Sequence, residues 1–320
     1  MLTSKQQLIK EAKSRGYKPE ILEKVYRLLD IFKQIMSVPY LAERLALKGG
    51  TALNLFCFQD IPRLSVDIDL NYIGELDREK MLEEKLVVID AIHQILLQNQ
   101  FERHRSPMHH AGGKMVWFYN SLLGQRGSLE IDINFMYRQP LYPIVYQASN
   151  INDDESWQAP MLDVHEIAAG KLSALFNRHA SRDLFDAHYL MTKVELDAKK
   201  LREAFVIYLA MTQVDLSSLE SRITEYDLTD LRNRLLPVMH QESLPRTLPK
   251  LKVWAETMVA ELQYALSVIL PLNENEEKFI QQIRIEGKVS PELVTHDEAL
   301  ANKIISHPGI GWAMKKAKEL

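Results

Sequence analysis

The chain has 320 residues, of which 46% are hydrophobic, and its formal net charge is −4. This composition excludes a disordered chain, and at about 100 to 200 residues per domain it predicts two domains, placed at 1–150 and 151–320. A single cysteine, Cys57, excludes a disulfide framework, and the lack of a signal peptide or a long apolar segment predicts a cytoplasmic protein without a membrane partner.

The first sixty residues predict two helices, a strand and a third helix. Apolar residues recur at helical spacing over 19–47, and Pro39 begins a second, shorter helix. Residues 45–48 predict a strand that runs into Gly49 and Gly50, and 51–58 predict a short helix. A backbone without Cβ at a helix start lets phosphate oxygens approach amide N–H groups, so Gly49, Gly50 and Thr51 are candidate nucleotide-binding residues.

Two later segments predict strands with acidic polar faces. Residues 64–73 alternate strictly, with Ser65, Asp67 and Asp69 on the polar face. A helix is predicted over 76–98, and a hairpin is predicted from strands at 114–119 and 128–136. The polar face of the hairpin's second strand carries Glu130 and Asp132. If the two strands are neighbours, Asp132 supplies a third carboxylate, with Glu130 as the alternative.

These carboxylates suit nucleotidyl transfer. Two metal ions about 3.5 to 4 Å apart neutralise the triphosphate and align the attacking hydroxyl. Acids two residues apart on a strand leave the same face and can share those ions, so Asp67, Asp69 and Asp132 are predicted ligands of Mg²⁺ or Mn²⁺, with an NTP as substrate. Ser65 is a candidate nucleotide contact on the same face. Neither the Walker A motif nor G-x-G-x-x-G is present, which disfavours a P-loop or Rossmann site.

Beyond residue 140 the strand signal fades and the chain becomes helical. Residues 164–177 predict a helix that contains Lys171, and Ser181 is the predicted N-cap of a helix containing Asp183 and Asp186. An acid near a helix start is favoured by the helix dipole, so a structural role for Asp183 stays open, and we expect Asp186 to be structural.

Two runs, Gly49-Gly50-Thr51-Ala52-Leu53-Asn54-Leu55 and Arg63-x-Ser65-x-Asp67-x-Asp69-Leu70, resemble the AbiEii/AbiGii-type nucleotidyltransferase toxins of the DNA polymerase β-like superfamily. Residues 166–175, 182–186 and 307–308 are similar to downstream motifs of that family. The resemblance extends from about residue 41 to the C-terminus. The glycine pair replaces the Gly-Ser of the wider superfamily, a departure that is common in this branch.

The resemblance implies an α+β fold, with a small mixed β-sheet nucleotidyltransferase core, an N-terminal helical segment and a helical C-terminal domain. It implies that Asp67 and Asp69 bind metal, that Lys171 contacts the triphosphate and that Asp183 completes the catalytic site. The implied function is that of a toxin in a toxin–antitoxin or abortive-infection system, a form of antiviral defence. Such a toxin transfers a nucleotide from an NTP to the 3′ end of tRNA and so blocks translation. A cognate antitoxin from a neighbouring gene is the implied partner.

Other interpretations stay open at this point. The same chemistry suits an acceptor hydroxyl on a protein or a small molecule, and a non-catalytic module that binds a nucleotide or an antitoxin is the second class. The segment with His104, His109 and His110 is predicted as a polar loop without a zinc site, because no cysteine accompanies it. The aromatic run 117–119 is predicted to be core rather than a platform for base stacking.

Overall fold

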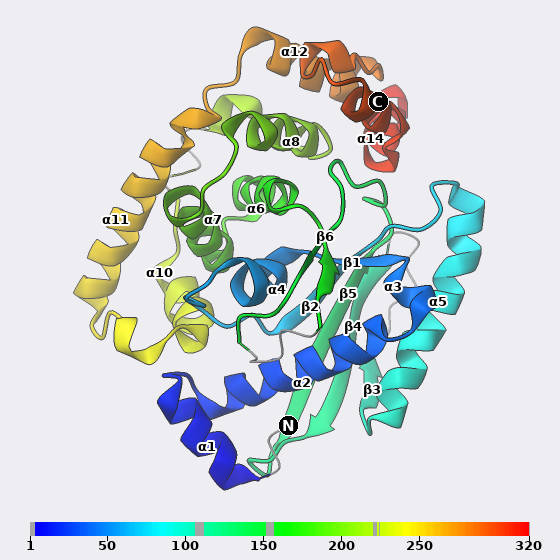
Figure 1. Cartoon of the computed structure of the whole chain (residues 1–320). Helices are drawn as coiled ribbons and strands as arrows, with labels where there is room; N and C mark the ends of the chain where they lie inside the picture. Colours follow the sequence, from blue (N-terminus) through cyan, green and yellow to red (C-terminus); the bar gives the residue numbers. More distant parts are fainter. Residues whose placement is uncertain (1–3, 106–111, 152–156, 220–222, 224, 320) are drawn as a thin grey trace. The chain divides into compact units, whose positions relative to one another are not determined.

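The computed structural model describes residues 4–105, 112–151, 157–219, 223 and 225–319. It divides into two compact units, each assembled from separate stretches of the chain (Figure 1). Unit 1 comprises Met1–Arg138, Ile144–Leu162 and Pro237–Leu244, and unit 2 comprises Gln139–Pro143, Asp163–Leu236 and Pro245–Leu320.

Unit 1 is built on a seven-stranded mixed sheet with the strand order β3-β4-β5-β2-β1-β7-β6. β2 runs parallel to β5 and β1 runs parallel to β7, whereas the other neighbouring strands are antiparallel. The predicted α+β class and the predicted hairpin, which is β4–β5, are confirmed. The strands are β1 (Leu45–Leu47), β2 (Asp67–Tyr72), β3 (Glu102–Arg105), β4 (Gly112–Asn120), β5 (Arg126–Asn134), β6 (Val145–Gln147) and β7 (Ala159–Met161).

Helices cover the apolar face of this sheet. Alternate residues such as Ile68 on β2 and Trp117 on β4 are fully buried, and α2 packs against β2, β5 and α5. The ring of His93 on α5 lies 5.3 Å from that of Trp117. Burial of Trp117 and Tyr119 agrees with the core prediction, whereas Phe118 points to the opposite face and is partly exposed. The unit 1 helices are α1 (Lys5–Ser14), α2 (Pro19–Met36), α3 (Pro39–Ala42), α4 (Gly49–Ala52), η1 (Leu53–Cys57), α5 (Arg78–Gln98) and η5 (Gln241–Ser243).

Some sequence predictions for unit 1 need correction. β2 begins at Asp67 instead of residue 64, because Leu64 pairs elsewhere: its N–H donates to the carbonyl of Val238. The side chain of Leu86 on α5 is 64% exposed, although the helical spacing predicted it as core. The short strands β3, β6 and β7 were not predicted, because three or four residues carry too little periodicity to be recognised.

Unit 2 is helical, as predicted for the C-terminal half. Its helix α6 packs against α7 and α8, and α11 packs against α7. The predicted break after residue 178 is present, but Ser181 is not the N-cap: α7 begins at Ser181, Ala180 is the cap, and the Ser181 N–H donates to Asp230. The elements are α6 (Val164–Arg178), α7 (Ser181–Lys193), α8 (Ala198–Ala210), η2 (Leu216–Ser218), α10 (Leu228–Asp230), η3 (Leu231–Leu235), α11 (Leu248–Ala265), η6 (Leu266–Val268), α12 (Glu274–Gln281), η7 (Gln282–Glu286), η8 (Pro291–Leu293), α13 (Glu298–Ser306) and α14 (Pro308–Glu319), and η4 (Leu236–Val238) lies at the boundary with unit 1.

A buried carboxyl group lies in the core of unit 2. Glu166 on α6 is 1% exposed and accepts hydrogen bonds from the N–H groups of Leu141 and Tyr142 and from the hydroxyl of Tyr208. Burial raises the pKa of Glu166 to about 7, although these hydrogen bonds oppose the shift. The folded protein therefore binds this proton more tightly than the unfolded chain does.

This linkage predicts a pH effect on stability. Between pH 4.5, the ordinary pKa, and about pH 7, the raised pKa of Glu166 should make the folded state lose stability as the pH rises. Glu166→Gln should remove that contribution, which is on the order of 3 kcal/mol. Urea unfolding of both proteins at pH 5 and pH 8 measures it, with the variant gaining relative to wild type at pH 8. Equal differences at the two pH values would contradict the assignment.

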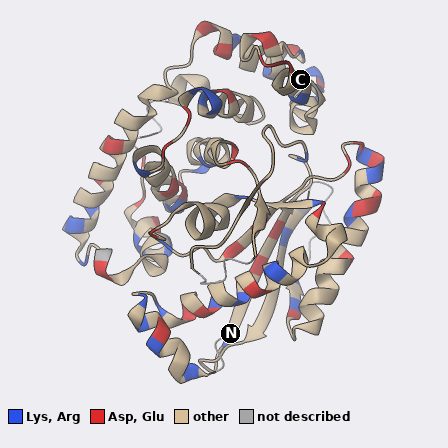
Figure 2. Ribbon diagram, in the orientation of Figure 1, with Lys and Arg blue, Asp and Glu red and all other residues tan. Residues whose placement is uncertain are grey.

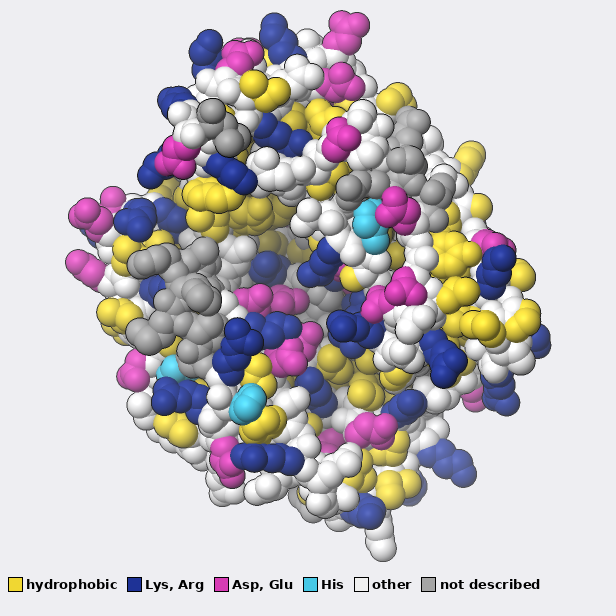
Figure 3. Space-filling model, turned by 180° about the vertical axis from the view of Figure 1, so that it is seen from behind, with side chains coloured by type: hydrophobic (Ala, Val, Ile, Leu, Met, Phe, Trp, Pro, Cys, Tyr) yellow, Lys and Arg dark blue, Asp and Glu magenta, His cyan; other side chains and the backbone are white. Residues whose placement is uncertain are grey.

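The surface carries both signs of charge. Figure 3 shows Lys and Arg side chains interspersed with Asp and Glu on the viewed face, in keeping with the small net charge of the chain. Among the described helices, none combines the length and the apolar character needed to cross a membrane.

Candidate active site

Two neighbouring strands of unit 1 carry the predicted carboxylates on one face of the sheet. In the parallel β2–β5 pair, Asp67 lies beside Glu130 and Asp69 lies beside Asp132. Residues paired in this way share a sheet face, so all four acids project from the same side. Figure 2 shows acidic residues on these central strands with a basic residue close by. The structure therefore brings Asp67, Asp69 and Asp132 together.

Within this acidic group, the surroundings of Asp67 raise the pKa of its carboxyl group overall. Burial raises the pKa of Asp67, and the charges of Glu130 and Asp69 raise it further, whereas Lys24 and Lys114 lower it. Lys114 on β4 forms an ion pair of 2.6 Å with Glu130. When burial and neighbouring negative charges raise the pKa of a carboxyl group, an additional cation nearby would stabilise its ionised form.

Gly49 is required for the position of Asp69. Its φ of +69° lies in the left-handed region, and a Cβ built on Gly49 would lie 2.4 Å from Oδ2 of Asp69. Any side chain there would displace the carboxylate as well as strain the backbone. The N–H of Lys48 also donates to the backbone carbonyl of Asp69 at 2.9 Å. Gly49 thus leaves room for the Asp69 carboxylate, a role that its sequence context did not predict.

The other predicted nucleotide-binding residues lie close to this strand. Thr51 is fully buried, and its hydroxyl donates to the backbone carbonyl of Asp67, which ties α4 to β2. Gly50 is buried, and its carbonyl accepts a 3.0 Å hydrogen bond from Nδ2 of Asn54. Ser65 is also buried and precedes β2 instead of lying on it. Their roles toward a nucleotide remain predictions.

The donor chemistry suits a hard divalent cation. Carboxylate oxygens on one face are the ligands that Mg²⁺ takes, and Mg²⁺ usually completes its shell with water and phosphate oxygens. In the described part of the chain, however, no group of three or more His, Cys, Asp or Glu side chains is gathered closely enough to hold a metal ion. Of the predicted His segment, His104 lies on strand β3 instead of in a loop, and His109 and His110 lie outside the described residues.

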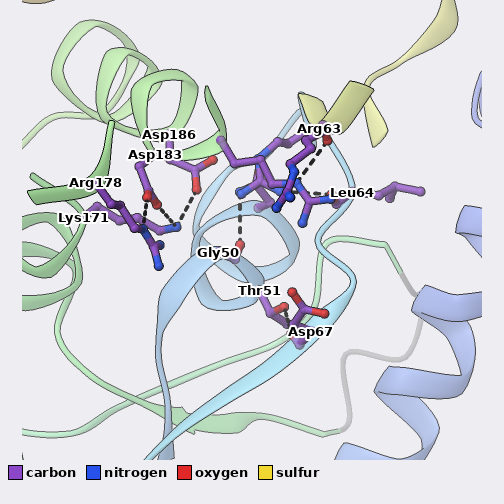
Figure 4. A network of polar contacts seen from close by, with 12 residues as sticks. Gly50, Thr51, Arg63, Leu64, Asp67, Lys171, Arg178, Asp183 and Asp186 are labelled. Carbon is purple, nitrogen blue, oxygen red and sulfur yellow. Dashed lines mark hydrogen bonds and ion pairs between the residues drawn. The ribbon is translucent and has the colours of Figure 1, made fainter. Parts of the chain in front are cut away.

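The remaining predicted residues, Lys171 and Asp183, lie in unit 2 and contact each other. Lys171 on α6 forms ion pairs with Asp183 at 3.1 Å and Asp186 at 2.9 Å, both on α7, and Figure 4 shows the two carboxylates pointing toward it. Asp183 also accepts a 2.6 Å hydrogen bond from Arg178. Burial raises the pKa of Asp183, but Lys171 and Arg178 outweigh it and hold that pKa below its usual range.

The sequence patterns did not identify Lys114 as a member of these groups. Lys114 could have been found, because a hairpin whose turn is centred on residue 123 places it opposite Asp132. Asp186 was expected to be structural, and its contact with Lys171 follows from helix packing, which local sequence patterns do not specify.

Comparisons with known proteins identify the family. The model of the nucleotidyl transferase AbiEii toxin family, of type IV toxin–antitoxin systems, matches residues 30–256. MenT4, a nucleotidyltransferase toxin from Mycobacterium tuberculosis H37Rv, has a similar fold, with a TM-score of 0.62 and 15% sequence identity over 97% of this chain and 99% of that one. No curated protein matches the sequence. The chain belongs to the AbiEii family of nucleotidyltransferase toxins, and its activity is nucleotidyl transfer.

Proposed function

We propose that this toxin transfers a nucleotide from an NTP to the 3′ end of tRNA in a reaction that needs Mg²⁺ or Mn²⁺, and that it thereby blocks translation in the cytoplasm. The proposal includes an abortive-infection role in antiviral defence and a neighbouring gene that encodes the antitoxin. Family membership supports the transfer reaction and the antitoxin, and the resemblance in the sequence supports tRNA as acceptor.

One observation carries the catalytic proposal: three carboxylates occupy adjacent positions on two neighbouring strands, and a glycine leaves room for one of them. Asp67 and Asp69 alternate on β2, Asp132 lies beside Asp69, and a Cβ at Gly49 would collide with the Asp69 carboxylate. A merely solvated strand face has no reason to keep a glycine in a left-handed conformation against an aspartate.

Each group then has a chemical task. Bound divalent cations neutralise the triphosphate and lower the pKa of the attacking hydroxyl. Asp67 and Asp69 would hold these cations, and Asp132 would hold the one at the hydroxyl and help to remove its proton. In the transfer, the hydroxyl oxygen bonds to the α-phosphorus while the bond to the pyrophosphate oxygen breaks. Lys171 would neutralise phosphate charge, and Asp183 would position Lys171 through their ion pair.

The acceptor is tested directly by labelling. Purified toxin is incubated with each α-³²P-labelled NTP in turn, Mg²⁺, and either deproteinised total RNA or RNase-treated lysate protein. We expect label from one NTP in RNA of tRNA size, and we expect EDTA to abolish it. Label in the protein fraction would show that the acceptor is a protein hydroxyl instead of tRNA. No label in either fraction, while the protein still inhibits growth, would favour the non-catalytic binding module.

A further inference from the structure

An ion pair lies among the acids on the polar face of the sheet, and the proposed chemistry leaves it unexplained. Nζ of Lys114 lies 2.6 Å from Oε2 of Glu130, and the two side chains are 49% and 28% exposed. Lys114 lies opposite Asp132 in the β4–β5 pair, and Asp132 lies beside Asp69 in the β2–β5 pair. One row across three strands therefore contains Lys114, Asp132 and Asp69.

Lys114 is coupled electrostatically to three acids of this face, Glu130, Asp67 and Asp69. Although partial burial opposes its charge, the hydrogen bond that Lys114 donates to Glu130 and the charges of Asp67, Glu130 and Asp69 raise the pKa of Lys114. The charges of Lys24 and Lys114 both lower the pKa of Asp67. An ion pair this exposed is weak, so the ammonium can exchange one anionic partner for another at low cost.

Glu130 is therefore engaged differently from the other acids. It lies beside Asp67 in the sheet, yet its carboxylate is bonded to a lysine. A metal ligand shared with an ammonium at 2.6 Å would bring two cations into repulsion. This arrangement favours Asp132 over Glu130 as the third ligand and leaves Glu130 to hold Lys114.

We propose that Lys114, held by Glu130, is a nucleotide-positioning residue whose ammonium balances the carboxylates in this structure and shifts to a phosphate of the bound metal–nucleotide complex. The inference rests on the function proposed above. The charge of Lys114 should have opposite effects on the binding of a free cation and of a nucleotide. Lys114 repels a divalent cation that binds without nucleotide, and it attracts the negative charge of the nucleotide.

The test compares Lys114→Met with Lys80→Met, a matched control because Lys80 is an exposed lysine on helix α5 and not on the strands that carry the carboxylates. Mn²⁺ binding without nucleotide is followed by EPR, and steady-state kinetics separate KM for the NTP from kcat. For Lys114→Met we expect Mn²⁺ affinity to rise about threefold to tenfold, because one repelling charge is removed. We expect KM to rise on the order of tenfold with kcat changed less, because a phosphate contact is lost. Lys114→Arg should restore KM, and Lys80→Met should change neither quantity.

A double-mutant cycle tests whether Glu130 acts through Lys114. Glu130→Gln should raise KM in the wild-type background and leave it unchanged in the Lys114→Met background. Asp69→Asn is included to separate the two proposals. If Asp69→Asn leaves Mn²⁺ binding intact, the metal-dependent function itself fails. If Asp69→Asn abolishes Mn²⁺ binding while Lys114→Met leaves Mn²⁺ affinity and KM within twofold of wild type, the role of Lys114 alone is overturned.

Discussion

Asp69→Asn should reduce nucleotide transfer by at least about a hundredfold to a thousandfold while leaving the protein folded. The substitution keeps the shape of the side chain and removes the charge that lies between Asp67 on the same strand and Asp132 on the neighbouring strand. Asparagine fits beside Gly49 as aspartate does, because the two side chains have nearly the same volume. Label transferred from NTP, measured per mole of folded protein, gives the effect on kcat.

A second readout of the same variant does not depend on activity. The charge of Asp69 raises the pKa of Asp67, so Asp69→Asn should move that pKa toward its ordinary value. Carboxyl titration followed by NMR measures the change. The matched control is Glu102→Gln on β3, which makes the same charge change in the same sheet at an exposed residue paired with Arg126. Full transfer activity in Asp69→Asn would exclude the proposed carboxylate mechanism.

Asp186→Asn should destabilise unit 2 by about 3 kcal/mol, because it removes one partner of a buried ion pair. Asp186 is fully buried, and its carboxylate lies 2.9 Å from Nζ of Lys171, whose side chain is 11% exposed. Lys171 would keep Asp183 as a partner but lose the buried charge of Asp186. The midpoint of urea unfolding, followed by circular dichroism at pH 7, measures the loss.

Two comparisons make this prediction specific. Glu256→Gln breaks an ion pair on α11 in which both partners are about half exposed, and it should cost only a few tenths of a kcal/mol. The double variant Lys171→Met with Asp186→Leu should recover part of the stability lost by Asp186→Asn, because a buried pair replaced by apolar groups no longer carries a desolvation cost. A loss below about 1 kcal/mol for Asp186→Asn would show that this ion pair does not hold α6 and α7 together.

The longer elements of the fold follow from local sequence patterns. Period-two alternation predicted β2 and β5, and helical spacing predicted α2, α5 and α6, because each element is long enough to bury one face repeatedly. Local sequence patterns failed to predict elements that are too short to show a repeat. β7 has only three residues, one of them Pro160, and it exists because it pairs with β1 on one side and β6 on the other.

In the candidate site, too, some residues were predictable from the sequence, whereas their contacts depend on tertiary structure. Asp67 and Asp69 were predictable, because two acids at alternate strand positions are unusual and project together. The partnership of Asp69 with Asp132 was not determined locally, since β2 and β5 pair in parallel across a long segment that contains α5, β3 and β4. The close contact between Gly49 and the Asp69 carboxylate likewise involves two elements, α4 and β2. It could not be predicted locally, because it depends on how these elements pack.

By itself, the sequence determined the α+β class, the acidic face of two strands and the family motifs, because these depend on periodicity and residue type within short windows. Only the tertiary structure decided that Asp132 lies beside Asp69, that Glu130 is paired with Lys114, and that Lys171 is held by Asp186 as well as Asp183. Strand register and helix packing fix these contacts. Both are set by burial of apolar faces that lie far apart along the chain.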